Sequence, residues 1–315
     1  MVPKIEKISE SLQVGESLHW DSETQSLYLV DIFGQSIHKY VPSTNRFTTG
    51  HVGKKTSFII PVQGKTDQFV ISIDRQIALI KWDGESTNIL ILEILYEVDN
   101  NTDNTLNDGK CDSVGRLWAG TFNPNISEIG EDKCSLYNFQ NKKVTTLLTK
   151  VGASNGLAFD DKLKKFYHID ILSGTLNQYD FDVTRGTIFC LPVYKTLANG
   201  KPIYTLNPKG GFTKFKQGLD GMAIDIDGNL WVAVFNGSRV IKIDPRKPDS
   251  IATSIQLPVK QVTSVAFGGP NLDELYVTTG KMTIFDETPS GPDDGALFKI
   301  TGLGTKGLPG VGVVL

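Results

Sequence analysis

Four oxygen-bearing side chains stand at nearly the same distance before an aromatic residue in four separate parts of the chain. Each aromatic partner is a Tyr or Trp within an apolar segment. The four pairs are Glu16 and Tyr28, Asn107 and Trp118, Asn155 and Tyr167, and Asp220 and Trp231. Ca²⁺ prefers oxygen ligands, and Mg²⁺ and Mn²⁺ accept the same donors with stricter geometry. Two carboxylates and two amides at equivalent positions therefore indicate a site for a divalent cation.

Two further segments fit the same spacing with hydroxyl side chains. Ser57 precedes Phe69 and Ser264 precedes Tyr276 by the same interval that separates Glu16 from Tyr28. All six equivalent positions thus carry oxygen, and none is basic. The surrounding motifs, such as Asn-Asp-Gly and Leu-Asp-Gly, are also ordinary turn sequences, and any one of them alone indicates no more than a turn. Their recurrence at one offset favours the metal site.

The aromatic residues belong to apolar segments that recur six times. Each segment follows a turn rich in Asp, Gly, Asn or Lys and precedes a second amphipathic segment. The six segments are 27–31, 68–71, 117–120, 166–170, 230–233 and 275–278. Their spacing is that of propeller blades, and it predicts an all-β, six-bladed β-propeller with four-stranded antiparallel blades and a metal site on the central axis, as one domain over residues 1–315. A pair of β-sandwiches would not repeat this pattern at blade length.

The propeller architecture also predicts where the oxygen-bearing residues lie. The innermost strand of each blade lines the central channel, so a residue just before that strand points at the axis. We therefore expect Asn107, Asn155 and Asp220 in tight turns at one rim of the channel. The long interval before Trp231 indicates an insertion at about 198–217, which is polar and rich in Gly and Pro and is expected to be a surface loop.

Composition argues against several classes of protein. A net charge of −3 without a long basic run argues against nucleic acid or an anionic membrane as a partner. The N-terminal segment lacks the apolar core of a signal peptide, and no segment has the length of a membrane span, so we expect a cytoplasmic monomer that acts on a small molecule. The three cysteines, Cys111, Cys134 and Cys190, are expected to be reduced thiols.

Other catalytic motifs are missing from the sequence. The four histidines show no metal-ligand spacing, and there is no nucleophile elbow, P-loop or Rossmann glycine set. His38 and His168 are expected to have structural roles, and Cys111 to be a buried, unreactive thiol.

Several motifs taken together resemble one known family. They are Val14-Gly15-Glu16-Ser17, Leu106-Asn107-Asp108-Gly109-Lys110, Ser154-Asn155-Gly156-Leu157 and Leu219-Asp220-Gly221-Met222. In this combination and order they are similar to the senescence marker protein/gluconolactonase/luciferin-regenerating enzyme family, which includes the regucalcin-like proteins. The similarity extends over essentially the whole chain. Within the family, segments 57–61 and 270–278 look closest to the insect luciferin-regenerating enzymes.

The resemblance implies a six-bladed propeller with one divalent cation on its axis, with Ca²⁺ as the first candidate and Mn²⁺, Mg²⁺ or Zn²⁺ as the others. It implies that Glu16, Asn155 and Asp220 bind the metal and that Asn107 lies beside it and faces the substrate. In lactonases of this type the metal polarises the ester carbonyl and a nearby carboxylate activates water. Asp220 is the position that matches this catalytic base.

Two positions depart from the pattern of the lactonases. Thr105 stands where they carry Arg, and Asn125 stands where they carry an acidic residue. Both changes remove groups that bind a polyhydroxylated substrate, and a rim expected to bear Phe58, Phe122 and Trp20 fits an apolar or aromatic ligand better. We therefore predict a metal-dependent hydrolase of a small lactone or heterocycle. The alternative is a metal-stabilised small-molecule binding protein that has lost sugar-lactonase activity.

Overall fold

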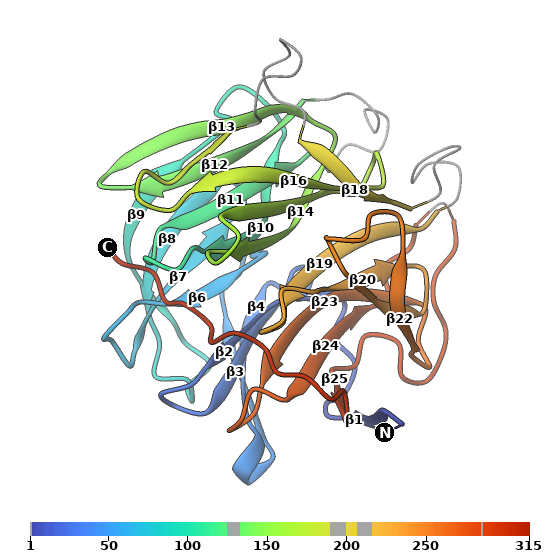
Figure 1. Ribbon diagram of the computed structural model, residues 1–315. Helices are drawn as coiled ribbons and strands as arrows, with labels where there is room; N and C mark the ends of the chain where they lie inside the picture. Colours follow the sequence, from blue (N-terminus) through green and yellow to red (C-terminus); the bar gives the residue numbers. More distant parts are fainter. Residues whose placement is uncertain (1, 125–132, 190–199, 207–215, 285) are drawn as a thin grey trace.

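Six antiparallel sheets surround a central axis, and each sheet is one blade of a β-propeller (Figure 1). The computed structural model describes residues 2–124, 133–189, 200–206, 216–284 and 286–315. The prediction of six antiparallel blades built on four strands is confirmed, and one blade carries a fifth strand. Within the described ranges, the helical structure given is a single 3-10 turn, Pro42–Thr44, and no helix there is long and apolar enough to cross a membrane.

The strands occupy four positions from the axis outwards. The innermost strands are β2 (Gly15–Asp21), β6 (Ile59–Pro61), β10 (Thr105–Cys111), β14 (Ser154–Asp160), β19 (Gly218–Ile224) and β23 (Gln261–Gly268). The second strands are β3 (Ser26–Asp31), β7 (Gln68–Ile73), β11 (Leu117–Phe122), β15 (Lys165–Asp170), β20 (Leu230–Phe235) and β24 (Glu274–Gly280). The third strands are β4 (Ser36–Val41), β8 (Gln76–Lys81), β12 (Cys134–Gln140), β16 (Thr175–Asp182), β21 (Arg239–Ile243) and β25 (Phe298–Thr301). The outermost strands are β5 (Arg46–His51), β9 (Leu90–Glu97), β13 (Lys143–Val151), β17 (Thr187–Phe189) with β18 (Lys201–Thr205), β22 (Ile251–Gln256) and β1 (Lys4–Lys7).

The recurring aromatic residues lie on the second strands, and their side chains fill the space between neighbouring blades. Both faces of a second strand pack against other blades, so its residues are apolar in succession rather than in alternation. Trp231 on β20 illustrates this packing, because its ring meets Phe267 of the next blade edge-on with centroids 5.8 Å apart. The hydrophobic core is therefore a ring of inter-blade contacts around the axis.

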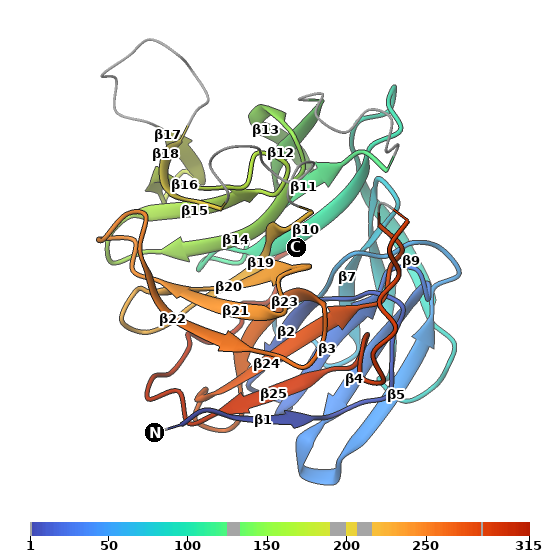
Figure 2. The same cartoon turned by 90° about the vertical axis from the view of Figure 1, so that its right-hand side faces the viewer.

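The last blade is completed by the first strand of the chain. β1 pairs with β25 in antiparallel register from Lys4 opposite Thr301 to Lys7 opposite Phe298. Figure 2 shows β1 lying along the outer edge of the blade that contains β24 and β25. The propeller is thus closed by hydrogen bonds between its N-terminal and C-terminal segments.

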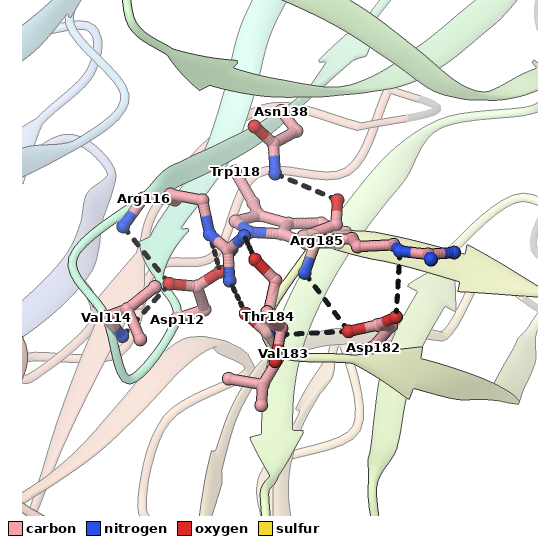
Figure 3. A network of polar contacts seen from close by, with 10 residues as sticks. Asp112, Val114, Arg116, Trp118, Asn138, Asp182, Val183, Thr184 and Arg185 are labelled. Carbon is pink, nitrogen blue, oxygen red and sulfur yellow. Dashed lines mark hydrogen bonds and ion pairs between the residues drawn. The ribbon is translucent and has the colours of Figure 1, made fainter.

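A buried ion pair joins the third blade to the fourth (Figure 3). Arg116 Nε donates to Asp112 Oδ2 at 2.8 Å, and the two side chains are only 3% and 0% exposed. The indole of Trp118 donates to the same carboxylate oxygen at 3.0 Å, and the guanidinium of Arg116 also donates to the backbone oxygens of Val183 and Thr184 in the fourth blade. A buried charge is tolerated only when it is paired and hydrogen-bonded in this way.

A C-terminal tail, residues 302–315, crosses one face of the propeller (red in Figure 1). Its backbone hydrogen bonds reach four blades, through Leu272, Ile226, Pro61 and Gly115. Val313 is buried against the third-blade core with 3% exposure. The tail therefore fastens the blades together at one end of the axis.

The Asn-Asp-Gly, Asn-Gly and Leu-Asp-Gly motifs are not tight turns, so that part of the prediction is wrong. They lie inside the innermost strands β10, β14 and β19, each at a β-bulge where the register with the second strand shifts. Glu16 lies at the corresponding bulge in β2. Bulges use the same small and polar residues as turns, which is why the sequence pattern does not distinguish them.

The insertion at about 198–217 is only partly a loop. Residues 201–205 form β18, which pairs with β16 and extends the outer edge of the fourth blade. Ile203 and Tyr204 are 1% and 9% exposed because they pack into the core cluster shared with the fifth blade. Residues 207–215 lie outside the described residues.

Candidate metal centre

Four of the predicted site residues line one cavity at an end of the central channel. Glu16, Asn107, Asn155 and Asp220 come from β2, β10, β14 and β19 and share a cavity of about 360 Å³, which we call the acidic cavity. Each sits at the bulge of its strand. A bulge re-aims the side chain relative to the regular alternation, and here it places one oxygen-bearing group from each of four blades in the same cavity.

Two glycines allow the innermost strands to approach each other at the axis. A Cβ on Gly156 would lie 2.6 Å from the backbone oxygen of Asp220, and a Cβ on Gly221 would lie 2.4 Å from Ser264 Oγ. The glycine that follows Asn155 and the one that follows Asp220 are therefore required for close packing rather than for a turn.

Hydrogen bonds fix the orientation of two of the four side chains. Asn107 Nδ2 donates to the backbone oxygen of Ser154 at 2.8 Å, which leaves its amide oxygen as the atom available to a cation. Glu16 Oε2 accepts from the Ser17 amide at 2.9 Å. Asn155 and Asp220 are each 6% exposed, whereas Glu16 and Asn107 are half-buried, so two of the four donors are well shielded from water.

The carboxylates of this cavity carry an unbalanced charge. Burial, followed by repulsion from Asp108, raises the pKa of Glu16 to about 8. Burial, followed by repulsion from Glu16 and Asp108, raises the pKa of Asp220 well above its usual range. Within the described ranges neither Glu16 nor Asp220 has an ion-pair partner, so a divalent cation would relieve both the desolvation and the repulsion.

The donor set fits such a cation only if the amides take part. No three His, Cys, Asp or Glu side chains in the described part of the chain are grouped closely enough to hold an ion by themselves. Glu16 and Asp220 supply two charges, while Asn155 and Asn107 can supply neutral oxygens from the same cavity. Carboxylate and amide oxygens in this mixture are typical ligands of Ca²⁺.

A third buried carboxylate, Asp108, was missed by the sequence reasoning. It is 9% exposed, and burial raises its pKa although Lys110 opposes this shift. Lys110 donates from Nζ to the backbone oxygen of Met222 at 2.6 Å and so connects β10 to β19 across the channel. The sequence does place a carboxylate directly after Asn107. It was overlooked because Asp is common in turns, and the motif was interpreted as a turn.

The remaining predicted site residues do not all reach the acidic cavity. Thr105, Phe122 and Ser57 line it, whereas in the sixth blade Thr263 lines it in place of Ser264. Asn125 lies outside the described residues.

Two aromatic residues expected at the rim lie elsewhere. Phe58 is fully buried in the core between the second and third blades, where its ring packs so closely against Gly109 that a Cβ there would lie 2.7 Å from it. Trp20 is 2% exposed and stacks on Tyr276 with centroids 5.7 Å apart. Both predictions are wrong: Phe58 turns away from the cavity side used by its neighbour Ser57, and Trp20 lies four residues beyond Glu16 along β2, outside the acidic cavity.

The histidines that were expected to be structural are buried and hydrogen-bonded, and the described cysteines form no disulfide. His38 contacts Ser36 and Thr49, and His168 contacts Ser154 Oγ at 2.8 Å. Cys111 and Cys134 are buried free thiols, and Cys190 lies outside the described residues.

A second cavity of about 670 Å³ lies at the other end of the channel, and we call it the tail-covered cavity. Its lining includes His19 and Lys110 from the innermost strands and Leu308 to Val311 from the C-terminal tail. Burial lowers the pKa of His19 to about 4, so its imidazole is neutral at physiological pH. The two cavities share no lining residue.

The fold and the cavity together define the class of protein: a six-bladed β-propeller with carboxylates and amides around one end of its axis. Comparisons with known proteins identify the family. Residues 14–281 match the family described as "SMP-30/Gluconolactonase/LRE-like region". The chain belongs to this family.

Individual relatives agree with this assignment. Regucalcin of Danio rerio is 33% identical over 304 residues, which are 96% of this chain and 95% of that protein. A solved luciferin-regenerating enzyme matches with a TM-score of 0.88 and 40% identity over 100% of both chains. A calcium-binding regucalcin from Agrobacterium tumefaciens shares the fold with a TM-score of 0.82 at 20% identity, covering 98% of this chain and 97% of that chain.

Proposed function

We propose that the protein is a divalent-metal-dependent hydrolase of a small lactone or heterocyclic substrate. The observation that carries this proposal is the meeting of two carboxylates, one buried and one half-buried and neither with an ion-pair partner among the described residues, together with two amides, in one cavity. Ca²⁺ is the first candidate, because the donors are all oxygen and two are neutral; Mn²⁺, Mg²⁺ and Zn²⁺ are the alternatives. The name of the family and the calcium-binding relative support the same reading.

The residues of the acidic cavity have separable roles in this mechanism. A bound divalent cation would supply Lewis-acid polarisation of the substrate carbonyl. Glu16, Asn155 and Asp220 would hold the cation, and Asp220 would also act as the general base that accepts a proton from the attacking water. Asn107, whose amide is oriented by Ser154, faces the substrate.

The rest of the cavity favours an apolar substrate. Its wall contains Phe122, Phe33 and Phe235, and Thr105 offers only a short hydroxyl. Such a wall excludes water around the reacting group, and it provides few donors for a sugar lactone. We therefore assign the protein to small apolar esters or heterocycles, as a cytoplasmic monomer that needs neither nucleic acid nor a membrane.

The test is metal analysis followed by a turnover screen on the purified protein. We expect about one divalent ion per chain and hydrolysis of at least one member of a panel of aromatic and aliphatic lactones. Asp220→Asn should lower kcat about a thousandfold because the base is lost while the shape is kept. Asp227→Asn, an exposed carboxylate of the same blade, is the matched control. Equal turnover by the Asp220→Asn variant would refute the mechanism.

The alternative function is a metal-stabilised binding protein without catalysis. Thr105 and the apolar wall support it, because the described lining offers few groups suited to bind a sugar lactone. A ligand that binds tightly to the metal-loaded protein and is recovered unchanged would favour this alternative.

A further inference from the structure

One cationic side chain stands on the largely apolar wall of the acidic cavity. Lys55 is the single Lys or Arg among the described residues that line it. The neighbouring wall consists of aromatic and aliphatic side chains, including Phe33, Phe122 and Phe235. The cavity therefore has a negative floor, formed by Glu16 and Asp220, and a single positive group on its wall.

The position of Lys55 is fixed at both its backbone and its side chain. Its backbone oxygen accepts from the Asp74 amide at 3.0 Å, and two positions further on the Ser57 amide donates to Ser72 Oγ at 2.6 Å. Its ammonium lies over the ring of Phe33, 5.2 Å from the centroid. A cation–π contact of this kind holds the charge in place without neutralising it.

The charge of Lys55 is not used by another protein group in the described part of the chain. No carboxylate there forms an ion pair with its ammonium, although Asp74 lines the same cavity. Most surface lysines are simply solvated, but Lys55 is half-buried whereas its neighbour Lys54 is exposed and does not line the cavity. A fixed, unpaired cation beside a small apolar cavity is suited to bind an anion.

We propose that Lys55 selects substrates that carry a carboxylate on an aromatic or similarly flat apolar ring, remote from the carbonyl that reacts. This inference rests on the proposed function and names its substrate class. Once the proposed cation balances Glu16 and Asp220, Lys55 is the one cationic side chain among the described residues of the cavity, and it holds the carboxylate end of the ligand at the wall. The ring then lies against Phe33, Phe122 and Phe235, and the reacting carbonyl is directed towards Asp220.

The test measures equilibrium binding of two isosteric probes that cannot be hydrolysed. The probes are 4-propanoylbenzoate and 4-propanoylbenzamide, and their dissociation constants are measured by calorimetry on the Ca²⁺-loaded protein. We expect the benzoate to bind more tightly than the amide. Lys55→Met should weaken the benzoate about fivefold and leave the amide within twofold, since only the charge pair is lost.

Two further variants and one change of conditions keep the result interpretable. Lys54→Met, the exposed neighbour, should change neither probe, and Lys55→Arg should keep the preference for the benzoate. Raising the salt to about 0.5 M should weaken the benzoate alone. The inference is overturned if Lys55→Met weakens both probes equally, if it changes neither, or if the wild-type protein does not prefer the benzoate.

The outcome is separable from that of the proposed function. If the protein prefers the benzoate in a way that depends on Lys55 but hydrolyses no member of the lactone panel, the recognition site is supported and the hydrolase is refuted. Hydrolysis that depends on Asp220 but is indifferent to Lys55 would support the hydrolase and overturn this inference.

Discussion

The two ends of the central channel are built from the same innermost strands but have opposite chemistry. Glu16 lines the acidic cavity, and further along β2 His19 lines the tail-covered cavity. Along β19 the same order holds, with Asp220 at the acidic end and Ala223 at the other. All the innermost strands that reach both cavities run from the acidic end to the covered end, so each carries its functional residue in its first half.

Electrostatics separates the ends further. At the acidic end burial leaves carboxylates without a partner and raises their pKa values. At the covered end the half-buried His19 is neutral because its pKa is lowered to about 4, and Lys110 donates to the Met222 oxygen. The acidic end therefore offers carboxylates whose charge a bound cation could balance, whereas the other end is covered by the C-terminal tail.

The largest expected contrast is in metal affinity. Glu16→Gln removes one of the two charged ligands of the proposed site and should weaken Ca²⁺ binding about a thousandfold, which corresponds to about 4 kcal/mol. His19→Gln, on the same strand but at its other end, should change the affinity less than twofold. Calorimetric titration of both variants checks this, and a similar loss in both would mean that the two ends are not independent.

The next effect concerns the tail. Deletion of residues 311–315 removes the buried Val313 and the hydrogen bonds of the tail to Pro61, Gln63 and Gly115. The free energy of unfolding should fall by about 3 kcal/mol, as measured in urea, because one apolar side chain and three backbone hydrogen bonds are lost. Ca²⁺ affinity should stay within twofold. If the deletion weakened Ca²⁺ binding and left the free energy of unfolding unchanged, the assignment of the tail to stability and of the acidic end to metal binding would be wrong.

A smaller effect should appear in the pH dependence of the metal-free protein. The pKa of Glu16 is about 8 in the folded state, against an ordinary value of 4.5. Because folding favours its protonated form, the stability it contributes is present below pH 4.5 and is lost as the pH rises through 8. The melting temperature should therefore fall by about 4 °C more in the wild type than in Glu16→Gln between roughly pH 6.5 and 8.5.

Two controls define the pH effect. Saturating Ca²⁺ should abolish it, because the bound cation keeps the carboxylates ionised. His19, at the opposite end of the channel, should not contribute to this pH effect. Its pKa is lowered from 6.5 to about 4, so the stability that it contributes is present above pH 6.5 and is lost as the pH falls below 6.5 and through 4. An identical slope in wild type and Glu16→Gln would contradict the assignment of the charge to this cavity.

The smallest effect is a steric one at the covered end. A Cβ on Gly310 would lie 2.5 Å from the backbone oxygen of Trp20 and 3.0 Å from His19 Nε2. Gly310→Ala should therefore displace the tail and cost about 1 kcal/mol in the free energy of unfolding. Leu308→Ala, which truncates a side chain that is 41% exposed in the same tail, is the control and should cost less.

The repeat of aromatic residues was sufficient to predict the six blades, because each blade buries the same side chains against its neighbours. Thr105 and Phe122 also line the predicted cavity, together with the four oxygen-bearing residues. The bulges could not be predicted, since Asn155-Gly156 has the composition of a turn while its glycine serves the close approach to Asp220. The burial of Phe58 could not be predicted either. Neighbouring residues of an extended segment point to opposite sides, so an error of one position moves a side chain from the cavity to the core.

Lys55 and Asp108 show a different limit. Neither belongs to a repeat at the offset of the other site residues, and their roles come from the fold around them. Lys55 is placed by a hydrogen bond to the backbone of Asp74, and Asp108 by the bulge that also directs Asn107. Long-range placement of this kind has no local signature in the chain.

The pairing of β1 with β25 bears on the order of assembly. These strands are separated by nearly the whole chain, so the ring cannot close until the last blade has formed, and such non-local pairing is slow. Closure of the ring also brings the innermost strands of the first and last blades together beside Glu16, where Thr263 donates to the Gly15 oxygen at 2.6 Å. The acidic cavity is therefore complete only after closure. Uptake of the cation should accordingly mark the final step of folding, and a nascent chain should be unable to acquire it early.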